Sequence, residues 1–462
     1  MRLHWHRRDL RASDNRGLAA AADDGPVVPV FVFDDELLAH ASPPRVRFML
    51  DALDSLRATY RERGSDLVVA RGDPREVLPA LVDDYDADGV TWNRDYSGLA
   101  RERDDAVRDA LAVPVETFHD ALLHEPGSIT TNAGDTYSVY SYFWKKWRDR
   151  EKADPYPTPT DGLADVAGDS LPSLSALGFD PPAASVPDAG TAAARERLAD
   201  FRAGPVFRYE TDRDYPAREG TSRLSADLKW GTVGIREVYA ATETATADAD
   251  GEAEADSVEE FQSQLAWREF YAHVLADAPR VVAENFREYE HSIEWRNDPE
   301  EIAAWKRGET GYPIVDAGMR QLRAEAYVHN RVRMLVASFL TKDLLVDWRV
   351  GYDWFRERLV DHDAANDSGG WQWAASTGTD AQPYFRIFNP TTQGERYDPD
   401  ADYITTYVPE LDGVAPETIH SWPELSPAER EAAAPDYLDP IVDHGERREA
   451  ALAMFEAARG EE

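Results

Sequence analysis

The stretch DHDAANDSGGWQW, residues 361–373, gathers side chains that could do chemistry. Asp361, Asp363 and Asp367 fall within seven residues, and two glycines and two tryptophans follow them. Carboxylates beside a histidine, His362, could hold a metal ion, or they could balance charge around a buried cofactor. Indole is among the more readily oxidised side chains, so tryptophans beside a redox cofactor could pass electrons to it. The stretch therefore indicates a metal site or a redox site.

The absence of cysteine narrows the chemistry further. It excludes a thiol nucleophile, a disulfide, a thiolate zinc site and a cysteine-held iron-sulfur cluster. A cofactor must therefore supply any redox centre. No G-x-G-x-x-G follows the first predicted strand and no G-x-x-x-x-G-K-[ST] occurs. The segment EGTSRLSADLKWG, residues 219–231, offers hydroxyls ahead of a helical pattern, which is typical of a phosphate site or of ordinary helix capping.

Two patterns predict the elements that must position these residues. Strand-like runs alternate with helical patterns such as 45–64, which predicts a parallel sheet with right-handed crossovers. The expected strands are RLHWH, PVVPVFVF, SDLVVARG, ADGVTWN and VPVETFHD, all within the first 120 residues. Pro-, Ala-, Ser- and Asp-rich sequence follows, and then mostly helical patterns. We expect an α/β domain over 1–130, a linker over 131–200 and a helical domain over 201–462. The acidic tract 241–260 is expected to be an exposed loop.

The charge balance indicates the environment of the protein. Asp and Glu number 88 against 50 Lys and Arg, which gives a net charge of -38. Such a surface suits a cytoplasm of high salt, where the Debye length falls to ~3 Å at 1 M; an acidic protein of an ordinary cell is the alternative. Neither an apolar signal core nor a run of ~18 apolar residues is found. We expect a cytoplasmic monomer with no membrane segment.

Several long motifs occur in a fixed order: GTSRLS, WREFY, TGYPIVDAGMRQL, HNRVRM, FLTKDLLVDWR and GGWQWAASTGTDAQPYFRIFNPTTQG. Together they resemble the photolyase/cryptochrome family, and most of all the class I cyclobutane pyrimidine dimer photolyases. The resemblance covers nearly the whole chain, including WHRRDLR and TNAGDTYSVYSYFWKKW. It implies an N-terminal antenna domain and a helical FAD domain that acts on ultraviolet-damaged DNA. The implied reaction is light-driven repair, in which excited reduced FAD gives an electron to a flipped-out dimer.

The resemblance also assigns residues. It implies that FAD is bound by Tyr209, Thr221, Ser222, Arg223, Leu224, Ser225, Arg333, Asp361, His362, Asp363 and Asp367. Arg333 would stabilise the reduced, anionic flavin while Asp361 holds the arginine in place. By the same resemblance, Trp371, Trp348 and Trp295 would transfer electrons to the flavin, and Asp367 beside the flavin would be a further catalytic residue. The residues that would contact DNA are Gln264, Trp267, Asn330, Arg331, Met334, Trp373 and Gln393.

Arg45, Asp95 and Lys229 resemble the antenna site of members that bind 8-hydroxy-5-deazaflavin. Methenyltetrahydrofolate is the alternative antenna, and surface charges with no ligand are the simpler interpretation. No metal is expected, although a metal held by Asp361, Asp363 and His362 stays open as an alternative.

Two positions depart from the class I pattern. Gln264 stands where most dimer photolyases have a glutamate, and Asp367 stands where they have an asparagine. Glutamine is more usual in (6-4) photolyases and animal cryptochromes, whereas aspartate is found in plant cryptochromes. A blue-light photoreceptor without repair activity and a (6-4) photolyase therefore remain alternatives. A helical flavoprotein with dark oxidoreductase activity is disfavoured by the lack of a nicotinamide-site motif.

Overall fold

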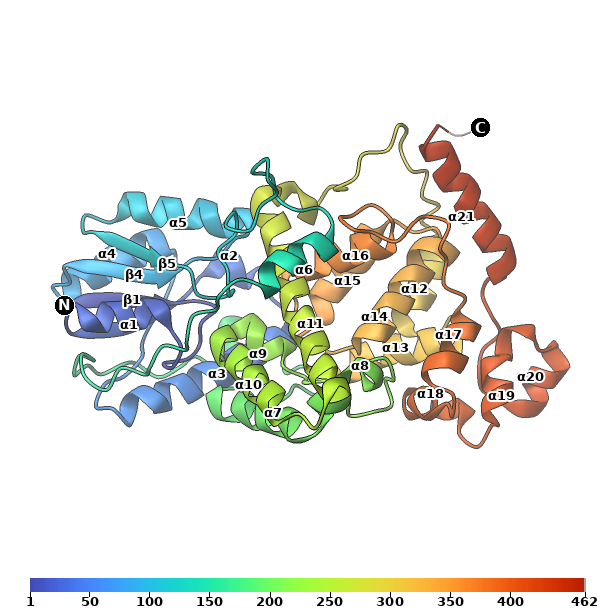
Figure 1. Ribbon diagram of the computed structural model, residues 1–462, viewed down its shortest axis with the longest axis horizontal. Helices are drawn as coiled ribbons and strands as arrows, with labels where there is room; N and C mark the ends of the chain where they lie inside the picture. The colour runs from blue at the N-terminus through green and yellow to red at the C-terminus, as the bar shows by residue number, and fades with distance from the viewer. Residues whose placement is uncertain (461–462) are drawn as a thin grey trace.

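A five-stranded parallel sheet forms the centre of the N-terminal part, with the order β3-β2-β1-β4-β5. A computed structural model of the protein describes residues 1–460 (Figure 1). The strands are β1 (Arg2–His6), β2 (Val27–Phe33), β3 (Val68–Arg71), β4 (Gly89–Asn93) and β5 (Val115–Phe118). The helices between them are α1 (Arg16–Asp23), α2 (Asp35–Leu38), α3 (Pro43–Arg61), α4 (Pro74–Asp84) and α5 (Gly98–Ala110). The predicted α/β arrangement is therefore confirmed.

Buried side chains cover both faces of the sheet. In β2, Val28 and Val30 belong to one apolar cluster, whereas Phe31 and Phe33 belong to the cluster on the other face. This alternation follows from the period of two in a strand. The chain runs outward on both sides of β1, which pairs with β2 and with β4. A crevice opens beside such a reversal at the carboxyl ends of the strands, where ligands bind.

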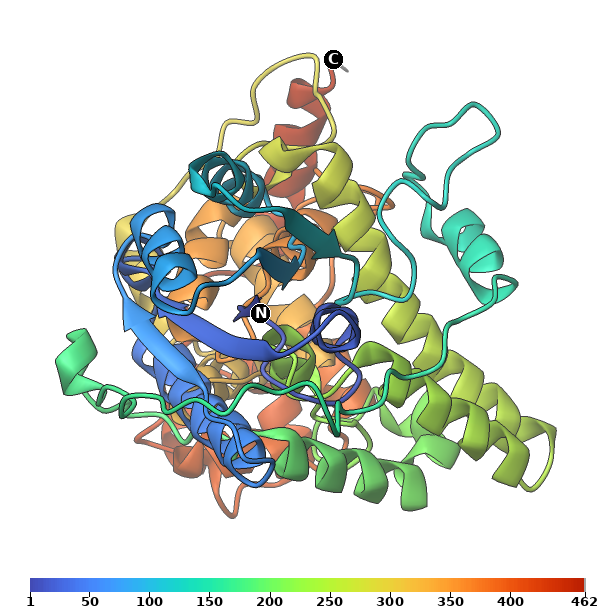
Figure 2. The same ribbon diagram turned by 90° about the vertical axis from the view of Figure 1, so that its left-hand side faces the viewer.

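The rest of the chain is helical. Its helices are α6 (Tyr140–Arg148), α7 (Thr191–Ala203), α8 (Tyr209–Asp212), α9 (Ser225–Trp230), α10 (Ile235–Asp248), α11 (Glu252–Asp277), α12 (Pro299–Arg307), α13 (Pro313–Glu325), α14 (Asn330–Ser338), α15 (Trp348–Arg358), α16 (Ala364–Ala374), α17 (Pro390–Tyr397), α18 (Asp402–Tyr407), α19 (Pro416–His420), α20 (Pro427–Ala433) and α21 (His444–Ala458). A π-helical turn, η4 (Phe339–Asp343), follows α14. In Figure 1 the long helix α11 runs near the middle of the molecule, with the sheet to its left and α12–α14 and α17–α21 to its right, and Figure 2 shows the sheet in front of the helices. Across residues 1–460, no helix combines the length and the apolar character that crossing a membrane requires.

The acidic tract 241–260 is helical, so the exposed loop predicted there is wrong. It forms the end of α10, a short turn and the start of α11. Alanine and glutamate, which dominate the tract, are strong helix formers. Ala245 and Val258 are fully buried where α10 packs on α11. Burial of these few apolar positions outweighs the charge of the tract.

The linker predicted over 131–200 also needs correction, because it contains α6 and most of α7. Tyr140, Phe143 and Trp147 recur at helical spacing on α6 and are buried. They join the apolar cluster around α11, which explains why this segment is ordered. Between the two helices the chain has little regular structure, as its proline content predicts.

Candidate functional site

A cavity of about 350 Å³ opens at the carboxyl ends of β1, β2 and β4. Aromatic side chains such as Trp5, Phe31 and Phe33 form its apolar wall. Charged groups from both parts of the chain form the rest of the wall, and they include Arg45, Asp95 and Lys229. The three residues expected to hold an antenna therefore lie on one cavity, although Lys229 is far from the other two in sequence. The size and the mainly apolar lining suit a flat aromatic ligand.

Arg8 connects the charges of this cavity. Its guanidinium donates to Asp95 at 3.1 Å and to Asp363 at 2.5 Å. Burial opposes ionisation of Asp363, yet the charges of Arg8 and Lys229 outweigh burial and lower the pKa of Asp363. Asp363 thus belongs to the cavity as well as to the stretch 361–373. The sequence motif WHRRDLR contains Arg8, but its spacing carries no sign of partners so distant along the chain.

Lys229 is a cavity cation whose charge can change near neutral pH. Burial and the charge of Arg8 lower the pKa of Lys229 to about 8. Burial also lowers the pKa of Arg45, to about 10, and Arg45 donates to the backbone oxygen of His40 at 2.8 Å. Arg45 therefore stays cationic at neutral pH, and the cavity favours an anionic ligand.

The three acids of the stretch 361–373 each have a different nearest partner, and that of Asp363 is Arg8. Arg333 donates to Asp361 at 2.7 Å, while Asp367 lies 2.5 Å from Nδ1 of His362. Arg333 is also 3.8 Å from Asp367. Burial opposes the charge of Arg333, but Asp361 and Asp367 together raise its pKa. The pairing of Arg333 with Asp361 that the resemblance implied is present, and the acids do not converge as a shared set of metal ligands would.

Helix α16 carries this stretch and begins directly after Asp363. The carboxylate of Asp363 accepts hydrogen bonds from the backbone N–H groups of Ala365 and Asn366, each at 3.2 Å, and so caps the helix. Gly369 lets α16 approach α11, because a Cβ at this position would lie 2.2 Å from the ring of Tyr271. The glycine of the motif is therefore needed for packing.

The three tryptophans of the expected relay belong to one core. Trp371 and Trp348 are buried, and Trp295 is partly buried at the edge of the same cluster. The indole N–H of Trp348 donates to Asn285 at 2.9 Å. No motif singled out Trp305, which is fully buried with its ring centre 6.0 Å from that of Trp371.

Arg223 holds in place the loop that the resemblance assigns to phosphate binding. Arg223 has a backbone φ of 53°, and its side chain turns to Glu325 at 3.1 Å. Ser222 accepts a hydrogen bond from the N–H of Leu224 at 3.4 Å, and Ser225 is the first residue of α9. The remaining residues of this group are Tyr209, which is buried, and Thr221, which is partly exposed. The helix start predicted from the hydroxyl pattern is present.

The residues expected to contact DNA lie on four helices: Gln264 and Trp267 on α11, Asn330, Arg331 and Met334 on α14, Trp373 on α16, and Gln393 on α17. Helix α16 contacts both α11 and α14. Trp267 stacks on Tyr140, with ring centres 3.7 Å apart and ring planes 12° apart. Asn330 and Arg331 both approach the sulfur of Met334, at 3.8 and 4.0 Å. Most of these residues are therefore carried by helices that pack together.

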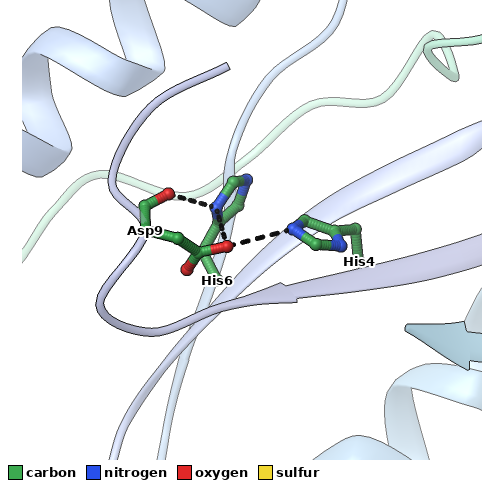
Figure 3. A group of neighbouring side chains, drawn as sticks. All are labelled: His4, His6 and Asp9. Atoms are coloured by element: carbon green, nitrogen blue, oxygen red, sulfur yellow. Dashed lines mark hydrogen bonds and ion pairs between the residues drawn. The ribbon is translucent and has the colours of Figure 1, made fainter. Parts of the chain in front are cut away.

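A separate cluster of His4, His6 and Asp9 lies at the end of β1 and in the turn after it (Figure 3). One ligand-type atom of each residue lies within 4.8 Å of the others. The carboxylate of Asp9 already accepts from the amides of Asn15 and Asn93, at 3.0 and 2.6 Å. The cluster therefore fixes the turn that carries Arg8 toward the cavity.

Comparisons with known proteins agree with this architecture. The family model described as DNA photolyase matches residues 2–160, and the model described as the FAD binding domain of DNA photolyase matches residues 261–457. The deoxyribodipyrimidine photo-lyase of Halobacterium salinarum is 65% identical over 100% of both chains. A bacterial class III photolyase from Agrobacterium tumefaciens has a TM-score of 0.91, 37% identity and coverage of 99% and 98%. An archaeal photolyase from Sulfolobus tokodaii, solved with two FAD molecules, has a TM-score of 0.85, 33% identity and coverage of 99% of both chains. The chain therefore belongs to the DNA photolyase family.

Proposed function

We propose that this protein repairs cyclobutane pyrimidine dimers in DNA with light and bound FAD, as a monomer in the cytoplasm of a high-salt cell. Residues 1–130 would carry the antenna and residues 201–462 the FAD and the DNA site. The observation that carries the proposal is the pairing of Arg333 on α14 with Asp367 on α16 and with Asp361 in the turn before α16, because α14 and α16 hold expected lesion contacts. Bound reduced FAD supplies the electron that light transfers to the dimer.

The polar groups around Arg333 fit such a cofactor. Oδ1 of Asp361 is buried and has no hydrogen-bond partner within residues 1–460, so it can accept from a donor group of the cofactor. Arg333 keeps its charge because two carboxylates face it, and this charge favours an anionic ring. The buried aromatic core around Trp371 excludes water from that side.

DNA binding by so acidic a chain needs a local positive surface, and α6 supplies one. Lys145, Lys146 and Arg148 occupy its last turns and are exposed, and Arg150 and Lys152 follow. Half of the six lysines of the chain therefore fall within eight residues. Trp267, in the expected lesion site, stacks on Tyr140 of the same helix. This helix is suited to contact DNA phosphates next to the lesion.

We also propose that the cavity beside Lys229 binds an antenna of the 8-hydroxy-5-deazaflavin type. An ionised hydroxyl on a flat ring matches an apolar cavity lined by Arg8, Arg45 and Lys229. The relative from Sulfolobus tokodaii, whose description names two FAD molecules and a novel light-harvesting cofactor, makes a second flavin the alternative ligand. The absorption spectrum of the purified protein distinguishes these pigments from methenyltetrahydrofolate.

One experiment tests the repair activity. FAD-loaded, photoreduced protein in concentrated KCl is incubated with oligonucleotides that carry a cyclobutane dimer or a (6-4) lesion. Samples are then illuminated or kept dark. We expect light-dependent restoration of the cyclobutane dimer only. Repair of the (6-4) lesion alone would favour the (6-4) alternative, and no repair of either lesion would favour a photoreceptor.

A further inference from the structure

Gln264, one of the two positions that depart from the class I pattern, has an acidic neighbour one helical turn earlier. The amide nitrogen of Gln264 donates to Oε1 of Glu260 at 2.9 Å on the same face of α11. Arg213 donates to the same oxygen and forms an ion pair with Glu260. The side chain of Arg213 is 21% exposed and that of Glu260 is 34% exposed, so both are held in a partly closed site.

This contact fixes which way the amide of Gln264 faces. An ionised carboxylate only accepts hydrogen bonds, so the NH₂ group of the amide must face Glu260. The carbonyl oxygen then faces away from Glu260 and is left to accept from another donor. Burial raises the pKa of Glu260, whereas Arg213 opposes this change. The ion pair with Arg213 thus maintains the acceptor that orients the amide.

The residue after Arg213 ties the same segment to a second DNA-contact helix. Asp214 accepts from Arg331 of α14 at 2.5 Å. Residues 213 and 214 therefore connect α11 to α14 through two ion pairs. Gln264 is therefore held in a fixed position relative to Arg331, through Glu260 and residues 213 and 214. Arg331 lies on α14, the helix that carries three of the expected lesion contacts.

We propose that Glu260 is a positioning residue of the lesion site, which turns the carbonyl oxygen of Gln264 toward the flipped dimer. The oxygen would accept the imide N3–H of a pyrimidine ring, the donor that a glutamate at this position could also satisfy. Glu260 does not touch the base. By accepting from the NH₂ group of Gln264, Glu260 leaves only the carbonyl oxygen of this amide to face the base. This inference rests on the proposed repair function.

The test compares two duplexes, one with a natural thymine dimer and one whose dimer is methylated at both N3 atoms. The wild type is expected to bind the natural dimer about fivefold to tenfold more tightly, the value of one net hydrogen bond. Glu260→Met frees the amide to rotate, so this ratio should fall to within about twofold of unity. Glu260→Gln keeps an acceptor oxygen and should retain the wild-type ratio. Glu252→Met, at an exposed acid at the start of α11, is the control for the same loss of charge.

Exchanging the two side chains gives an independent readout. Gln264→Glu alone places two carboxylates one turn apart with only Arg213 between them, so dimer affinity should fall about fivefold or more. In the double variant, Glu260→Gln with Gln264→Glu, the new amide at position 260 can donate to the new carboxylate at position 264 and accept from Arg213. It should regain wild-type affinity.

The outcomes separate the two proposals. If the wild type repairs dimers but Glu260→Met keeps the wild-type binding ratio, or the exchange does not restore binding, the positioning role of Glu260 is overturned. If the wild type shows no light-dependent repair, the proposed function is overturned and this inference with it.

Discussion

Replacing Asp363 by asparagine should destabilise the protein through the charges that surround it. Asparagine caps a helix as well as aspartate does, so the contacts to the N–H groups at the start of α16 should survive. The ion pair with Arg8 is lost, and Arg8, Lys229 and Arg268 are left with less compensating charge. Removing one partner of a buried pair costs about 3–5 kcal/mol. Because Arg8 is 28% exposed and keeps Asp95, we expect about 2–3 kcal/mol.

Urea unfolding in concentrated KCl, followed by tryptophan fluorescence, measures this change. Asp51→Asn is the matched control, because Asp51 forms an exposed pair with Arg47 on α3 whose loss should cost under about 0.5 kcal/mol. The pKa of Asp363 is lowered in the folded state, so its stabilisation is present above the ordinary value of 3.8 and is lost as pH falls below it. The asparagine variant should therefore lose less stability on acidification than the wild type. Equal unfolding free energies for the two variants would refute the electrostatic role of Asp363.

Three further predictions concern other residues. Trp371→Phe should slow photoreduction of bound FAD at least about tenfold but leave repair by chemically reduced protein within about twofold; equal loss of both in flash spectroscopy and repair assays would make Trp371 structural. Because the pKa of Lys229 is about 8, binding of an anionic deazaflavin should weaken as pH rises through 8, and Lys229→Met should bind weakly at every pH; a titration in which both proteins share one pH profile would contradict this. Burial raises the pKa of Asp343 to about 6, so the stability that its protonated form contributes is full below pH 3.8 and is lost as pH rises through 6. Asp343→Asn should remove about 2–3 kcal/mol of this pH dependence of stability. Thermal melts between these two pH values measure the dependence, and the same dependence in the variant as in the wild type would contradict the prediction.

The sequence predicts the fold well where periodicity is strong. The five strands follow from short β-branched runs, and the inner strand β2, between β3 and β1, is buried on both faces as its composition requires. The prediction failed at 241–260, where charge suggested a loop, because Ala245 and Val258 supply enough buried surface to hold two helices together. It also failed at α6, whose apolar stripe is short and borders a proline-rich segment.

For the candidate site, the sequence predicted which types of residue take part, but it did not predict which of them pair with one another. The motif around Asp361 indicated a charge-balanced cofactor, but the pairing of Asp363 with Arg8 joins residues 355 positions apart. No local pattern encodes such a contact. Glu260 escaped notice for a different reason: in an acidic chain, one glutamate on a helix face carries no signal until its partners, Arg213 and Gln264, are seen.

The distribution of lysine makes α6 unusually easy to modify selectively. Among the six lysines, Lys145 and Lys146 are the exposed ones, whereas Lys229 lines the cavity and Lys342 is buried. A limiting amount of a lysine-reactive dye should therefore attach to side chains mostly on this one helix. The natural sequence thus supplies a labelling site without engineered cysteine, at the surface where we expect DNA to approach. Protection of these two amines by damaged DNA would report the bound state directly.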